Sequence, residues 1–239
     1  MRRVLLLLFV CCITPIAAGE AVEAWYEMEL LGQPGGWSHS LEQSREGEVQ
    51  YSSETAMRIK RGAIEVSIRM QSDWVETTAG VPITMTMRQD MSGQRMTMLW
   101  TFKGDTIEVT GSQGGRRTSS TVAAPKESWY PAGALQRETA RRVVAGEEEF
   151  SLRAMLPDIG VKIVTVTSTR TGSEDYELDG KTIPVTIWKV SNDAMPFGSV
   201  VKLNAKGEIV ENITDAPFGK IVMRRTTKSK ALAALEGSD

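Results

Sequence analysis

Hydrophobic and polar residues alternate along most of the chain between residues 24 and 122. The alternation is regular over 64–71, 81–88 and 96–102, where every second residue is apolar. A period of two is typical of antiparallel strands that have one apolar and one solvent-facing side. Glycine-containing turns interrupt the runs where hairpins require them, at 32–36, 46–47, 61–62, 92–93, 103–105 and 114–115. The first half of the chain therefore predicts a series of β-hairpins.

The pattern changes to helical spacing at one place, between residues 125 and 146. Leu135, Thr139, Arg142 and Val143 follow a helical period, and Gly146 can end the helix. We therefore expect one helix over 132–145. Strands are expected to resume after it and to be followed by a short helical tail at 228–235; the expected strands are 148–155, 161–171, 174–178, 182–190, 199–204, 208–214 and 219–227.

These elements predict a mainly β protein. We expect a single large curved antiparallel sheet, a half-open barrel, with one covering helix near 131–145, because the only long helix can then cover the concave face. We expect residues 19–239 to form this single β-rich domain. Two β domains are the alternative, with a sub-boundary near 123–146.

Residues 1–18 resemble an export signal. Arg2 and Arg3 precede an apolar run, which small residues follow at Ala17 and Ala18. The run is too short to cross a bilayer, so we expect no transmembrane segment. The protein is expected to be exported and to be periplasmic or extracellular after signal cleavage.

Removal of the export signal would leave the protein without the residues that several kinds of catalytic and metal site require. Cys11 and Cys12 are the two cysteines of the chain, and His39 is its one histidine. Without the signal, the chain has no thiol nucleophile, and zinc or iron sites that need several His or Cys ligands are excluded. His39 is expected to be an ordinary exposed or hydrogen-bonded strand residue. The sequence thus predicts a protein that is not an enzyme and that has no cofactor and no metal.

The charged residues point to no substrate class. The net charge is −2, which does not favour nucleic acid as a partner. Asp73, Glu76, Asp90 and Asp105 flank predicted turns, where carboxylates are common for local reasons. No pair of acids indicates a glycosidase site.

Methionines are concentrated on two neighbouring predicted strands. Met85, Met87, Met96 and Met98 fall on the apolar side of the alternation. Thioethers suit Cu(I), but strict alternation explains all four positions without a metal. Flexible methionines can instead line a face that repacks around different ligands. The residues predicted to bind such a ligand are Met85, Met87, Met96, Met98, Trp100 and Phe102, with Leu135 and Val143 from the helix opposite.

The stretch from Trp25 to His39 resembles the first hairpin of β-rich regions in bacterial exported proteins that precede a transglutaminase-like catalytic domain. The segments 172–185 and 203–210 are similar in style. The given sequence ends at Asp239 without a Cys-His-Asp domain, so no catalytic residue is carried over and the resemblance implies an accessory module. The order of strands, helix and strands is also similar to lipoprotein-carrier half-barrels.

Two functions follow as hypotheses. The first is an exported, non-enzymatic binding or accessory module that carries an apolar ligand (a lipid, lipoprotein or peptide) on the concave face of the sheet. The alternative is a structural or partner-binding domain that supports a separately encoded enzyme of the cell envelope, and it predicts an exposed apolar patch or an unpaired edge strand.

Overall fold

A computed structural model describes residues 21–61, 64–155, 161–217 and 219–236. The predicted export signal at 1–18 lies outside the described residues. Fourteen strands and two helices follow one another as β1 (Val22–Leu30), β2 (Gln33–Arg45), β3 (Glu48–Arg61), β4 (Ile64–Thr77), β5 (Pro82–Met91), β6 (Gln94–Lys103), β7 (Thr106–Gln113), β8 (Arg116–Ala123), α1 (Ala132–Val144), β9 (Glu149–Met155), β10 (Ile163–Leu178), β11 (Lys181–Asn192), β12 (Ser199–Leu203), β13 (Ile209–Ala216), β14 (Gly219–Thr226) and α2 (Lys228–Glu236).

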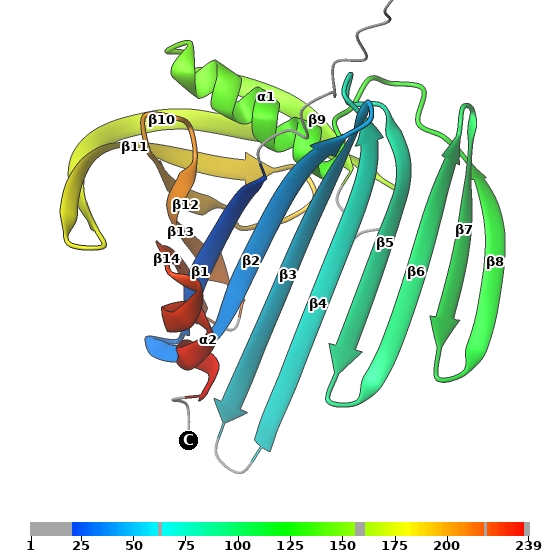
Figure 1. Ribbon diagram of the computed structural model, residues 1–239, viewed down its shortest axis with the longest axis horizontal. Helices are drawn as coiled ribbons and strands as arrows, with labels where there is room; N and C mark the ends of the chain where they lie inside the picture. The colour runs from blue at the N-terminus through cyan, green and yellow to red at the C-terminus, as the bar shows by residue number, and fades with distance from the viewer. Residues whose placement is uncertain (1–20, 62–63, 156–160, 218, 237–239) are drawn as a thin grey trace, which may run out of the picture.

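All fourteen strands belong to one antiparallel sheet that is not closed. Consecutive strands are paired in the sheet except for β8 and β9, which lie at its opposite edges. The pairing of β1 with β14 joins the two halves of the chain. The free edges of the sheet are β8 and β9. The sheet curves strongly, and α1 lies across one end of its concave side (Figure 1). The predicted mainly β, half-open sheet with a covering helix is confirmed.

Two predicted strand boundaries are wrong. Residues 33–36 form the start of β2 instead of a turn. Glycine is needed at position 36 because this residue lies so close to β3 that a Cβ there would be 2.2 Å from the backbone oxygen of Ala56. Likewise, 163–178 is one strand, and a bulge between Arg170 and Gly172 replaces the expected break. In both places the glycine lies within a strand, where it permits a close contact or a bulge, and does not form a turn.

The second helix packs on the convex side. Ala231 of α2 is fully buried against Trp37 and Ala56, and Trp25 and Leu235 flank this cluster. The concave side is therefore left to α1 and to the segment that precedes it. Among the described residues, no helix is long and apolar enough to span a bilayer.

Candidate functional site

A cavity of about 480 Å³ lies between α1 and the concave face of the sheet. One wall comes from β9–β12, the opposite wall from β1–β3, and the side chains of Leu135, Gln136, Thr139 and Ala140 project from α1. The turn between β12 and β13 closes one side, because Gly207 approaches Ala140 so closely that a Cβ would lie 2.6 Å from the Cα of Ala140.

The β9–β12 wall is apolar. Phe150, Trp188, Val201 and Leu203 are all buried by the protein and form one cluster, against which Leu135 packs. The rings of Phe150 and Trp188 are 5.5 Å apart, and the indole N–H of Trp188 donates to Thr186 Oγ1 at 2.8 Å. These side chains present hydrocarbon to the cavity, so this wall favours an apolar ligand.

The β1–β3 wall is more polar. Tyr26, Ser40, Glu42 and Tyr51 line it, and Arg225 adds a cation from β14. Burial raises the pKa of the Tyr51 phenol to about 12 and also raises that of Tyr26, so both phenols stay neutral. Arg225 is already paired with Glu208, at 2.7 Å between Nη1 and Oε2.

A partly buried ion-pair network fixes α1 over this wall. Arg137 of α1 donates to Glu42 Oε2 at 2.7 Å and to Glu76 Oε1 of β4. Burial raises the pKa of the Glu76 carboxyl, whereas the Arg137 guanidinium and the backbone N–H of Ala134 lower it. Partial burial lowers the pKa of Arg137, but the two carboxylates raise it above its ordinary value.

Glu76 takes the place of a missing helix cap. The N-cap residue of α1 is Pro131, which offers no side-chain hydrogen bond, and the first turn contains no acid. Glu76 supplies a carboxylate from the sheet and accepts the N–H of Ala134, which favours the helix N-terminus electrostatically. Gly133 permits this approach, since a Cβ there would lie 2.9 Å from Glu76 Oε1 and 3.0 Å from the Cβ of Tyr51.

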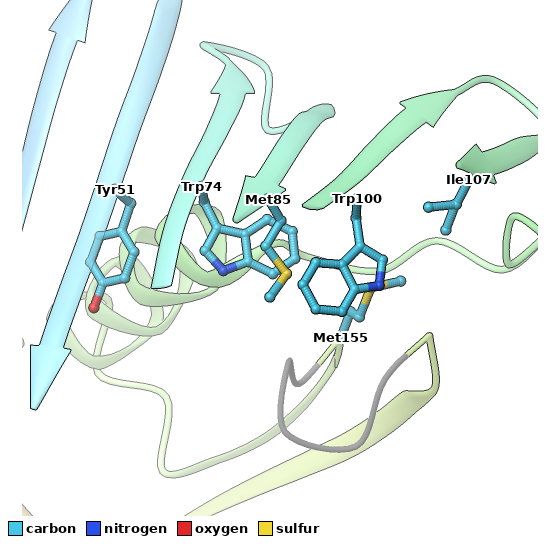
Figure 2. Packing of buried hydrophobic residues seen from close by; sticks show 6 residues of the cluster. All are labelled: Tyr51, Trp74, Met85, Trp100, Ile107 and Met155. Carbon is cyan, nitrogen blue, oxygen red and sulfur yellow. The ribbon is translucent and has the colours of Figure 1, made fainter. Parts of the chain in front are cut away.

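The residues predicted to bind ligand are divided between two places. Register aligns Tyr51, Trp74, Met85 and Trp100 in one row across β3–β6 (Figure 2). Met85 and Trp100 of this row are fully buried, and they form one cluster with Ile107 of β7 and Met155 of β9. Met87, Met98 and Phe102 pack against the same cluster, whereas Met96 is half-buried on β6.

Leu135 and Val143 belong to the other half of the concave face. Both pack on the Phe150–Trp188 cluster, and Leu135 lines the cavity. The expectation that Leu135 and Val143 lie opposite the methionine-bearing strands is wrong. The first residue of α1, Ala132, packs there together with Trp129 and Met155. Whether any of the eight residues binds a ligand stays a prediction.

His39 lies away from the cavity. Alternation places it on the convex side, where its ring stacks on Trp25 with 4.1 Å between centroids. Its Nε2 is 2.9 Å from Glu23 Oε1. Within the part of the chain that the structure describes, no group of three or more His, Cys, Asp or Glu side chains could hold a metal ion.

Sequence reasoning missed the role of Glu76. The residue was expected to flank a turn for local reasons, as Asp90 does by accepting the N–H of Gly93 at 2.8 Å. Glu76 is instead fully buried and bonded to a residue 61 positions away. One signal was available, because Glu76 follows Trp74 by two positions and so shares its apolar face.

Comparison with known proteins supports the fold alone. No protein-family model matches the chain, and no curated protein matches it in sequence. A crystal structure of a beta-barrel-like protein of domain of unknown function DUF1849 from Brucella abortus is similar in fold, with a TM-score of 0.61 and 12% identity. The match covers 86% of this chain and 95% of the other. The resemblance to transglutaminase-associated regions is not confirmed.

Proposed function

We propose that the chain is an exported, non-enzymatic module that carries an apolar ligand in the cavity beneath α1. The observation that supports this proposal best is the cavity itself. Its volume of about 480 Å³ lies within the range of roughly 300–1,000 Å³ found for small-molecule sites. One apolar wall and a few convergent polar groups are the usual composition of such sites.

The construction of α1 also supports a ligand site. The helix is tied at its N-terminus by the Glu42–Arg137–Glu76 network and at its C-terminal end by Arg142, whose guanidinium lies 5.6 Å from the centre of the Phe150 ring. Between these ends, small residues such as Thr139 and Ala140 face the cavity. Because α1 is fixed at both ends and carries small side chains between them, it leaves space for a ligand between the helix and the sheet.

A displacement assay tests the proposal. Purified protein is titrated with 1-aminoanthracene, whose fluorescence rises in apolar surroundings, and the dye is then displaced by oleic acid and by long-chain alcohols. The variant Val190→Trp places a large ring in the cavity from β11, and Lys189→Trp places the same ring on exposed surface. We expect binding to wild type and to Lys189→Trp, with loss in Val190→Trp. Equal dye binding by all three proteins would refute the proposal.

A second candidate function is support of a separate envelope enzyme, and β8 favours it. All eight residues of β8 are exposed, and the strand pairs only with β7. The other edge is partly covered, because Tyr130 donates its N–H to the Arg153 carbonyl of β9 at 2.8 Å. A bare edge is a template for a partner strand.

The two functions can be separated with two variants. Ser120→Lys adds a charge to the bare edge, which should abolish a complex formed through β8 and leave dye binding unchanged. Val190→Trp should do the reverse. A stable envelope complex that survives Ser120→Lys would exclude the edge as its docking site.

A further inference from the structure

Asn212 places an amide group in the apolar part of the cavity. The residue lines the cavity from β13 and lies directly opposite Val201 of β12 and Met223 of β14. Val201 is in turn opposite Trp188, so the amide adjoins the Phe150–Trp188 cluster in one row across the sheet. A polar side chain among hydrocarbon neighbours is expected to use its hydrogen-bonding groups.

The oxygen of this amide is bonded to a short chain of hydroxyl groups. Asn212 Oδ1 accepts the Thr214 hydroxyl at 3.4 Å, and Thr214 Oγ1 is 2.7 Å from Ser199 Oγ. Because the Thr214 proton is directed to Asn212, Ser199 is the donor in the second bond. Ser199 also lines the cavity, and its oxygen is thereby left only with lone pairs.

The nitrogen of the amide is unused. Among the described residues, Asn212 Nδ2 donates to no protein atom. It is not enclosed by the protein either, because the enclosed side-chain atoms that lack a partner in the described part of the chain all belong to β4. The cavity wall therefore presents the N–H groups of Asn212 as donors beside the Ser199 oxygen as an acceptor.

The surroundings of this pair favour an uncharged ligand group. Val201 and Met223, the register neighbours of Asn212, carry no charge. The guanidinium of Arg225, farther along the same face of β14, is already paired with Glu208 at 2.7 Å. A carboxylate beside Asn212 would lose its hydration without gaining an unpaired cation, which is costly. A neutral group needs only a donor and an acceptor.

We propose that Asn212 and Ser199 form a polar subsite for the head group of an acylated ligand, whose carbonyl oxygen accepts from Asn212 Nδ2 and whose N–H or O–H donates to Ser199 Oγ. The hydrocarbon chain lies along the apolar wall. This inference rests on the proposed function and specifies its ligand class: an alkyl chain with a neutral head group that both accepts and donates. Such a head group occurs in a fatty amide, which has an N–H, and in an acylglycerol, which has an O–H.

The experiment compares four probes of the same chain length. Oleamide and 1-monooleoylglycerol can accept and donate, methyl oleate can only accept, and 1-octadecene can do neither. Each probe displaces 1-aminoanthracene from wild type, Asn212→Leu and Ser199→Ala. Ser151→Ala is the matched control, because Ser151 forms the same kind of cross-strand pair with Thr167, at 2.9 Å, on the convex side. Urea unfolding of each variant establishes that it is folded.

We expect Asn212→Leu to weaken the three carbonyl probes roughly five- to tenfold, the effect of one lost hydrogen bond. Ser199→Ala should weaken only the two probes that donate, by a similar factor. Neither variant should weaken 1-octadecene, and Ser151→Ala should bind all four probes as wild type does. The tighter of oleamide and 1-monooleoylglycerol identifies the source of the head group.

The possible failures are distinguishable. If Asn212→Leu does not fold, Ser199→Ala decides alone. Unchanged affinity of the donating probes in Ser199→Ala, or an equal loss for all four probes, would overturn the subsite. Failure of every probe to bind wild type would instead overturn the proposed function itself.

Discussion

The attachment of α1 to the sheet gives the sharpest stability prediction. Glu76 is fully buried, and its cation partner Arg137 is 36% exposed. Arg137→Met keeps the length of the side chain but leaves the carboxylate without its cation. Removing one partner of a buried pair costs about 3–5 kcal/mol, and the partial exposure of Arg137 lowers our expectation to about 2–3 kcal/mol.

The stability lost in Arg137→Met should depend on pH. Burial raises the pKa of Glu76 above 4.5, so the folded state favours the neutral carboxyl, and this stabilisation is lost as the pH rises through the folded pKa. Removing Arg137 also removes a group that lowers this pKa. The destabilisation of Arg137→Met relative to wild type should therefore be larger at pH 8 than at pH 5.

A double-mutant cycle completes the test. Glu76→Gln supplies a neutral amide of similar shape, so Glu76→Gln/Arg137→Met should recover at least half of the stability lost by Arg137→Met at pH 8. The free energy of unfolding is measured by urea titration, with tryptophan fluorescence as the signal. Equal costs at both pH values, together with no recovery in the double variant, would refute the assignment of Glu76 as the buried anchor of α1.

Three further predictions concern packing and titration. Gly133→Ala should destabilise by about 1–3 kcal/mol in urea titration, because its Cβ meets Glu76 and Tyr51, whereas Gly172→Ala, with a nearest atom at 4.0 Å, should cost much less. Met85→Ala should cost about 2–5 kcal/mol and the half-buried Met96→Ala clearly less; equal losses would contradict the packing of the two strands. In an ultraviolet titration, Tyr51→Phe should remove a phenol that ionises near pH 12, whereas loss of a phenol that ionises near the ordinary pKa of 10.0 would show that Tyr51 is not buried.

Much of the fold could be predicted from the sequence because its signals are local. Alternation identifies the strands, and the spacing of Leu135, Thr139 and Val143 identifies α1 within one residue at its C-terminal end. Predictions failed where glycine serves a close contact or a bulge, as at Gly36 and Gly172. A glycine that permits a turn and one that permits close approach look alike in sequence.

The site was harder to predict because its parts meet through the register of distant strands. Leu135 was predicted to line the ligand site, and it does line the cavity. Glu76, Arg137 and Trp188 were not singled out, since no local pattern relates residues that come from β4, α1 and β11. The methionines were singled out because they are concentrated on two neighbouring strands. The segment before α1 packs against that half of the sheet, so the cavity lies elsewhere.

Native mass spectrometry tests the central claim most directly. The chain is purified from its native cell, without added lipid or detergent, and its intact mass is recorded for wild type and for Val190→Trp. Our account predicts a bound apolar molecule on wild type that gentle collisional activation releases, and its absence from the variant. Wild-type protein that carries no ligand, or a ligand that Val190→Trp retains equally, would contradict it.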